Sequence, residues 1–141
     1  MKIIIIGSGN VAYHLAKAFR ENKIAVSQLF GRNKIDLQFI SKDLGIPFST
    51  DTLAAADLYF ICVSDGSIAE VSHLITNENC LVAHTSGSLP KEILDGNYRK
   101  ASFYPLQTFS KSKNLDYKKI PFFVEAESQS HLELLTNMAL Q

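Results

Sequence analysis

Short apolar runs alternate with segments of helical periodicity along this chain. Ile3–Ile6 is a continuous β-branched run, which is typical of a central strand covered on both faces. After it, Ala12, Leu15, Ala16 and Phe19 recur at i, i+3, i+4 and i+7, which predicts a helix with one apolar stripe. The same reasoning predicts further strands at residues 25–30, 46–49, 58–63, 80–84, 101–104 and 121–125.

Helical segments are expected between these strands. Gly45 has the position of a C-cap for a helix over residues 37–44, and Asp51 that of an N-cap for a short turn over 52–56. Residues 67–75 and 90–94 are also predicted to be helical. Ser128 or Ser130 is expected to cap a last helix, whose apolar stripe contains Leu132, Leu135, Met138 and Ala139.

Strands that alternate with helices imply right-handed βαβ crossovers. The expected class is therefore α/β, with a doubly wound, mostly parallel sheet in three α/β/α layers, the Rossmann dinucleotide-binding fold. We expect this domain to cover residues 1–127. Residues 128–141 would start a linker helix toward a helical C-terminal domain absent from the chain, because the stripe stops in mid-pattern. Leu132, Leu135 and Met138 would then form an exposed apolar patch.

Composition narrows the possible functions. The 141 residues suffice for one domain, and 46% apolar with 20% charged residues indicates a soluble globular protein. Fourteen basic and fourteen acidic side chains cancel, so no general attraction to nucleic acid or to a membrane is expected. Cys62 and Cys80 lack metal-binding spacing and are interpreted as buried thiols in a cytoplasmic protein, with no metal site.

The first strand leads into Gly7-Ser8-Gly9-Asn10-Val11-Ala12, a G-x-G-x-x-A turn at the start of a helix. In dinucleotide sites the first glycine permits the bend and the second lets the backbone approach a diphosphate. Free N–H groups at the helix start favour an anion there. The alternative is a plain strand-to-helix turn that needs glycine for its backbone angles.

Arg32 and Asn33 follow the second predicted strand, where an NAD site usually has an acidic residue. A guanidinium can grip the 2′-phosphate of NADP, so we expect NADP rather than NAD. The alternative is that Arg32 is an ordinary solvated loop charge.

Two further strand ends carry small polar residues. Ligands of doubly wound sheets lie beyond the carboxyl ends of the strands. The candidate cofactor-binding residues here are Val63, Ser64 and Asp65 after one strand, and Thr85, Ser86 and Gly87 after the next. Asp65 or Ser67 could instead cap a helix, and the second group could be a hydrogen-bonded turn.

No catalytic residue is assigned from the sequence. Tyr104, which precedes Pro105, and His84 at a strand end are the weak candidates. Tyr104 could instead be a half-buried aromatic residue with a polar tip. His14 and His73 have no nearby cysteine or carboxylate in metal or triad spacing and are interpreted as structural histidines.

The stretches GSGNVAYHLAKAF, GRN, VSDGSIAEV, HTSGSLP and FYPLQTFSK together resemble a bacterial Rossmann-like family of NADP-dependent oxidoreductases. In that family an N-terminal cofactor domain precedes a helical domain of unassigned function. Pyrroline-5-carboxylate reductases, ketopantoate reductases and deazaflavin-dependent NADP oxidoreductases have a related architecture. The resemblance implies an NADP(H) site built from Gly7, Ser8, Gly9, Asn10, Val11, Arg32, Asn33, Ser64, Thr85, Ser86 and Gly87.

The resemblance also implies a homodimer formed through the helical region, which would supply much of the substrate pocket. Relatives often carry His at the position of Tyr104, so any chemistry that depends on that His would be absent from this chain. The expected function is an NADP-binding domain of an oxidoreductase that transfers hydride between NADP(H) and an unidentified small molecule. The alternatives are a non-catalytic nucleotide-binding or cofactor-sensing module, and a mononucleotide or sugar-phosphate binder.

Overall fold

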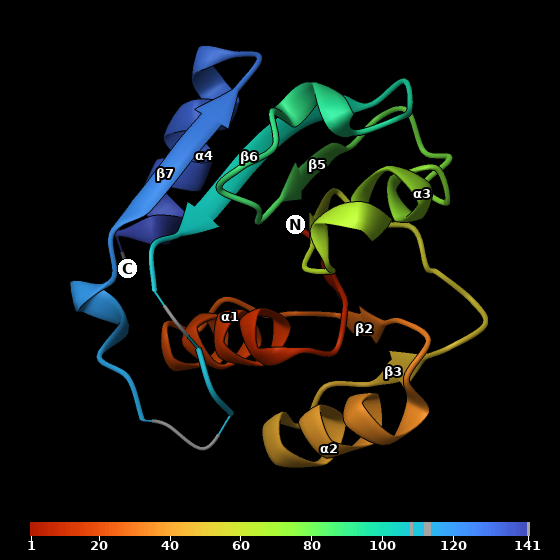
Figure 1. Cartoon of the computed structure of the whole chain (residues 1–141), viewed down its shortest axis with the longest axis vertical. Coiled ribbons are helices and arrows are strands. Elements are labelled where there is room, and N and C mark those ends of the chain that lie inside the picture. Colours follow the sequence, from red (N-terminus) through yellow and green to blue (C-terminus); the bar gives the residue numbers. More distant parts are fainter. Residues whose placement is uncertain (108, 112–113, 141) are drawn as a thin grey trace.

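A computed structural model describes residues 1–107, 109–111 and 114–140, which leaves Thr108 of the FYPLQTFSK stretch and the final Gln141 outside it. Its sheet has the strand order β3-β2-β1-β4-β5-β6-β7 (Figure 1). Neighbouring strands from β3 to β6 pair in parallel, and β7 pairs with β6 antiparallel. The strands are β1 (Ile3–Ile6), β2 (Gln28–Phe30), β3 (Phe48–Ser49), β4 (Leu58–Ile61), β5 (Leu81–His84), β6 (Arg99–Pro105) and β7 (Phe122–Ala126).

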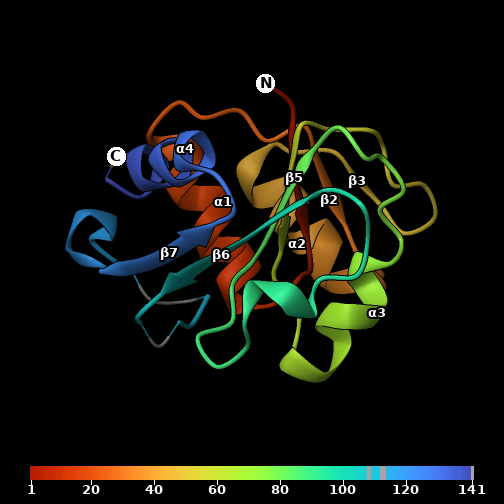
Figure 2. The ribbon, with the colours of Figure 1, turned by 90° about the horizontal axis from the view of Figure 1, so that it is seen from above.

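Helices cover both faces of this sheet (Figure 2). One face packs against α1 (Asn10–Glu21), α2 (Lys34–Leu44) and α4 (Gln129–Ala139). The other face packs against α3 (Ile68–Ser72) and the segment that contains the 3₁₀ turn Lys91–Ile93. The predicted three-layer, doubly wound and mostly parallel α/β fold is confirmed.

Strand β1 lies at the centre of the sheet, and its side chains pack against the helical layers on both faces. All four isoleucines of Ile3–Ile6 are buried. Ile3 and Ile5 pack in the core beneath α1 and α2, whereas Ile4 and Ile6 pack in the core beneath α3. This arrangement explains the continuous apolar run and places the end of β1, at Gly7, in the middle of the carboxyl edge of the sheet.

The predicted helical turn at residues 52–56 is wrong, because this segment has no regular secondary structure. Side chains bond its backbone groups instead. The Ser49 hydroxyl accepts the N–H groups of Asp51 and Thr52 at 3.1 and 2.9 Å. The Gln28 amide donates to the carbonyl of Thr52 and accepts the N–H of Ala54. Such side-chain bonds compete directly with helix formation.

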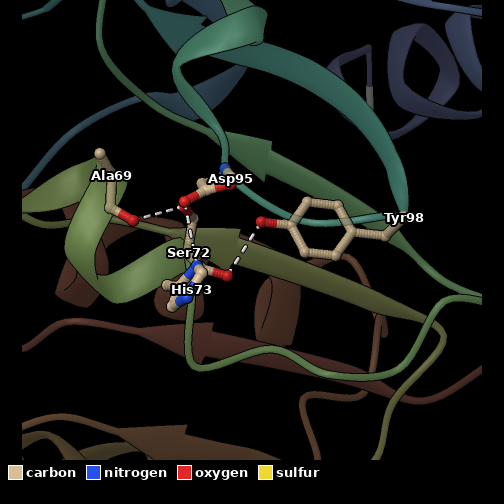
Figure 3. Close-up of polar contacts among 5 residues, drawn as sticks. All are labelled: Ala69, Ser72, His73, Asp95 and Tyr98. Atoms are coloured by element: carbon tan, nitrogen blue, oxygen red, sulfur yellow. Dashed lines mark hydrogen bonds and ion pairs between the residues drawn. The ribbon is translucent and has the colours of Figure 1, made fainter.

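Helix α3 ends earlier than predicted, at Ser72, where buried polar groups join it to the segment after β5 (Figure 3). The Ser72 hydroxyl donates to the Ala69 carbonyl at 2.7 Å and accepts the Asp95 N–H at 2.9 Å. The Tyr98 hydroxyl donates to the Ser72 carbonyl at 2.9 Å. His73, for which no carboxylate partner was predicted, pairs with Asp95 at 3.0 Å on the surface.

Helix α4 is capped by Ser128, whose hydroxyl accepts the His131 N–H at 3.2 Å. Its side chains Leu135 and Met138 are buried in the core shared with α1, so the expectation that they would be exposed is wrong. The antiparallel β7 brings α4 back onto this face. The division at residue 127 stays a prediction. Among the described residues, no helix is long and apolar enough to cross a membrane.

Candidate functional site

Two adjoining cavities lie beyond the carboxyl ends of β1, β4 and β5. The first has a volume of about 350 Å³ and lies between the turn after β1, the end of β2 and α3. The second has a volume of about 650 Å³ and lies between the start of α1 and the loops after β4 and β5. Gly9, Cys62, Val63 and Ser64 line both cavities, so one extended ligand could occupy the two together.

The structure brings every predicted cofactor-binding residue to these cavities. The first is lined by Gly7, Ser8, Gly9, Arg32, Asn33, Val63 and Ser64. The second is lined by Gly9, Asn10, Val11, Val63, Ser64, Asp65, Thr85, Ser86 and Gly87, together with Tyr104. The residues come from four different strand ends, so their convergence is a property of the fold. That they bind a nucleotide stays a prediction.

The two glycines of the turn after β1 differ in their surroundings. Gly7 has φ of +128°, and a Cβ there would lie 2.2 Å from the carbonyl oxygen of Cys62. Gly7 is therefore required by the protein itself. Gly9 has φ of −84°, and a Cβ there would meet no atom within 4 Å. Nothing within the described residues requires glycine at Gly9, and the open space above it suits a ligand that approaches the backbone.

Helix α1 begins at the two cavities, and no side chain caps or neutralises its amino end. Gly9 is its N-cap, no side chain caps it, and its first turn holds no acidic residue. The first N–H groups and the positive end of the helix dipole are thus left to attract an anion. The Asn10 side-chain amide is turned toward the segment after β6, where it donates to the Phe109 carbonyl at 3.0 Å.

Arg32 and Asn33 close the first cavity at the end of β2. Asn33 caps α2, since its side-chain oxygen accepts the Asp36 N–H at 3.1 Å. Within the described residues no carboxylate forms an ion pair with Arg32, so its guanidinium is available to an anionic ligand. Glu70 of α3 also lines this cavity and gives it one charge of each sign.

Sequence reasoning missed the wall that α3 contributes. Val71 and Leu74 line the first cavity and offer apolar surface, and Leu74 is 55% exposed. The sequence predicts a helix over residues 67–75 and assigns none of its side chains to a site. No signal in the sequence separates Val71 and Leu74 from core residues, because the exposure of an apolar side chain depends on how the segment packs.

Cys62 and Cys80 are buried free thiols, as predicted, and Cys62 also lines both cavities. Burial raises the pKa of its thiol to about 12. Cys62 therefore stays protonated and cannot act as a nucleophile at neutral pH.

In the second cavity, Asp65 and Ser88 link the loops after β4 and β5. The Ser88 hydroxyl donates to the Asp65 carboxylate at 2.8 Å. Neither Asp65 nor Ser67 caps a helix with its side chain. The capping alternative for these two residues is therefore wrong, and the Asp65 carboxylate stands on the cavity wall.

Tyr104 forms the opposite wall of the second cavity. A Cβ on Gly87 would lie 2.5 Å from the Tyr104 ring, so the glycine lets the ring pack against this turn. Phe123 of β7 stacks on the Tyr104 ring, with ring centroids 6.2 Å apart. Tyr104 is half-buried at the end of β6, as the structural alternative predicted, and it also lines the cavity.

His84 lines neither cavity and is fully buried. Its Nδ1 accepts the Ser86 N–H at 3.1 Å, so Nε2 carries the proton and donates to the Pro90 carbonyl at 3.0 Å. Both ring nitrogens thus bond the backbone of the loop after β5. His84 therefore stabilises this loop and does not face either cavity.

His14 is buried under the segment after β6. Its Nε2 donates to the Ser110 carbonyl, and its Nδ1 accepts the Tyr117 hydroxyl at 2.6 Å. Phe109 stacks on the imidazole with centroids 5.2 Å apart. The interpretation of His14 as a structural histidine fits these bonds, which fasten the segment after β6 onto the helix that starts at the candidate site.

No protein-family model matches this chain, and no curated protein matches it either. Solved structures do match it. A protein from Bacteroides fragilis, described as a "putative NADP oxidoreductase", is 32% identical with a TM-score of 0.90, over 98% of this chain and 56% of that one.

Two more distant structures have the same fold. A pyrroline-5-carboxylate reductase from Coxiella burnetii is 18% identical with a TM-score of 0.75, over 98% of this chain and 55% of that one. Prephenate dehydrogenase from A. aeolicus, solved in complex with NAD+, is also 18% identical, with a TM-score of 0.75 over 99% of this chain and 56% of that one. The chain thus spans about half the length of these proteins, and the predicted Rossmann-like fold is confirmed.

Proposed function

We propose, from this match to a Rossmann-like NADP oxidoreductase family, that the chain is a dinucleotide-binding domain that binds NADP(H). The whole protein would transfer hydride between NADP(H) and a small molecule, and the nicotinamide would supply that chemistry. A cytoplasmic location and a homodimer belong to the same proposal.

The observation that carries the proposal is the convergence of Arg32 and the amino end of α1 on the first cavity. One anion would lie at the helix end, as the diphosphate of a dinucleotide does. A second would lie at the guanidinium, as the 2′-phosphate of NADP does. Val71 and Leu74 add apolar surface for the adenine ring.

The remainder of the ligand would then extend into the second cavity, past the shared residues Val63 and Ser64. The nicotinamide would then lie near Asp65, the turn at Ser86 and Tyr104, which line that cavity. The N–H groups and hydroxyls of these loops would hold its ribose and amide.

Arg32→Ala tests the assignment of NADP. We expect the variant to lose about tenfold or more in NADPH affinity, because one charge-assisted phosphate contact is worth that much. Its NADH affinity should change little, since NADH lacks the extra phosphate. Isothermal titration calorimetry with both coenzymes measures this difference.

Lys34→Ala is the matched control, since Lys34 carries the same charge two positions on and does not line the cavity. If Arg32→Ala lowered the affinities for NADPH and NADH equally, the proposed role of Arg32 would be contradicted. A wild-type chain that binds ATP but neither pyridine coenzyme would contradict the proposed function itself.

A further inference from the structure

The second cavity has an unbalanced charge. Among the described residues that line it, Asp65 is the only carboxylate, and none is Lys, Arg or His. The first cavity, in contrast, contains both Arg32 and Glu70. A ligand group in the second cavity therefore meets a negative charge that no neighbouring side chain on the wall cancels.

A hydrogen bond from the neighbouring loop orients the Asp65 carboxylate. Its Oδ2 accepts the Ser88 hydroxyl at 2.8 Å, from the loop after the next strand. The Ser88 N–H in turn donates to the Ser86 hydroxyl at 3.2 Å. Since Asp65 is exposed to solvent on the cavity side, a ligand can approach it without first breaking the core.

On the proposed function, the nicotinamide occupies this second cavity. The oxidised nicotinamide ring carries one positive charge, and the reduced ring carries none. A carboxylate beside the ring attracts the positively charged oxidised form, and it gains no such attraction from the neutral reduced form. We propose that Asp65 makes the site discriminate between the redox forms of its coenzyme, in favour of NADP+ over NADPH.

This preference has a direct consequence for hydride transfer. When NADPH gives up hydride, its two electrons and the hydrogen pass to the substrate and the ring becomes cationic. A site that binds the cationic product more tightly makes bound NADPH a stronger hydride donor, since charge near the ring tunes its potential. Asp65 would thus promote reduction of the substrate without touching it.

The test compares NADP+ and NADPH affinities of the wild type and Asp65→Asn by calorimetry. Asparagine keeps an oxygen that can accept the Ser88 hydroxyl, so only the charge is removed. We expect the ratio Kd(NADP+)/Kd(NADPH) to rise about threefold or more, as for one partly screened charge pair. Glu133→Gln on α4, which lines neither cavity, removes the same charge and should leave the ratio unchanged.

A second measurement follows the same two proteins as the salt concentration is raised. Because the preference is Coulombic, the wild-type ratio should rise with added salt, while that of Asp65→Asn should stay nearly constant. An Asp65→Asn protein that binds both coenzymes in the wild-type ratio at low salt would overturn the role of Asp65 and leave the proposed function standing. A wild-type chain that binds neither coenzyme would overturn both.

Discussion

Gly7 and Gly9 stand two positions apart in one turn and are glycine for different reasons. Gly7 is held at positive φ against the Cys62 carbonyl, so its lack of a side chain is a condition of folding. Gly9 has an ordinary φ and empty space where its Cβ would be, so its lack of a side chain leaves room for something else. At the scale of single residues, the fold thus explains the glycine at Gly7 and does not explain the one at Gly9.

Gly9→Val should abolish binding of NADPH and NADH, because the side chain fills the space above the amino end of α1. Its unfolding transition should stay close to that of the wild type, since a Cβ at this position meets no atom within 4 Å. Gly7→Ala should instead unfold at lower denaturant, because its Cβ collides with backbone. Chemical denaturation and calorimetry of both variants check this. Normal coenzyme binding by Gly9→Val would show that this turn has only a structural role and does not contact the coenzyme.

At the scale of elements, the sequence predicted what depends on local pattern and missed what depends on contacts between distant segments. Ile3–Ile6 and the G-x-G turn could be assigned because apolar runs and glycines act locally. The contribution of α3 to the first cavity could not, because it depends on how Ser72 anchors that helix to Asp95. Residues 52–56 were misread because the Gln28 side chain, far away in sequence, bonds their backbone.

The anchor of α3 gives a prediction for stability. Ser72→Ala should lower the free energy of unfolding by about 1–3 kcal/mol, because the Asp95 N–H loses its partner in a partly buried place. Urea denaturation measures this value. His73→Ala, which removes only the exposed pair with Asp95, is the control and should have little effect. A Ser72→Ala protein as stable as the wild type would show that water replaces the hydroxyl.

At the scale of the whole molecule, β7 and α4 complete the sheet and one of its covering layers. Leu135 is fully buried between α4 and the sheet, whereas Leu140 near the end of the same helix is 77% exposed. Both side chains are apolar, but the predicted helical stripe contains Leu135 and not Leu140. The antiparallel β7 leads the chain back so that this stripe meets the core. The periodicity of the last helix therefore could not distinguish a docked helix from an unpartnered one.

Leu135→Ala should destabilise the folded state by about 2–5 kcal/mol, as expected for a large-to-small change in a packed core. Leu140→Ala should change stability by less than about 0.5 kcal/mol, as expected for an exposed position. Thermal unfolding of the two variants side by side tests whether α4 is part of the cooperative unit. Similar small effects for both would indicate that α4 is only loosely attached.

The reversal of β7 also determines where the two ends of the chain lie. Met1 borders the same hollow as Leu58, Leu81 and Arg99, at the starts of β4, β5 and β6. Ala139 and Leu140 border a hollow with Phe122. Phe122 pairs with Pro105, the last residue of β6. A protein immobilised on a sensor chip through its amino terminus would therefore be attached at the edge of the sheet opposite the two candidate cavities, whereas attachment after Leu140 would be at the same edge as the cavities.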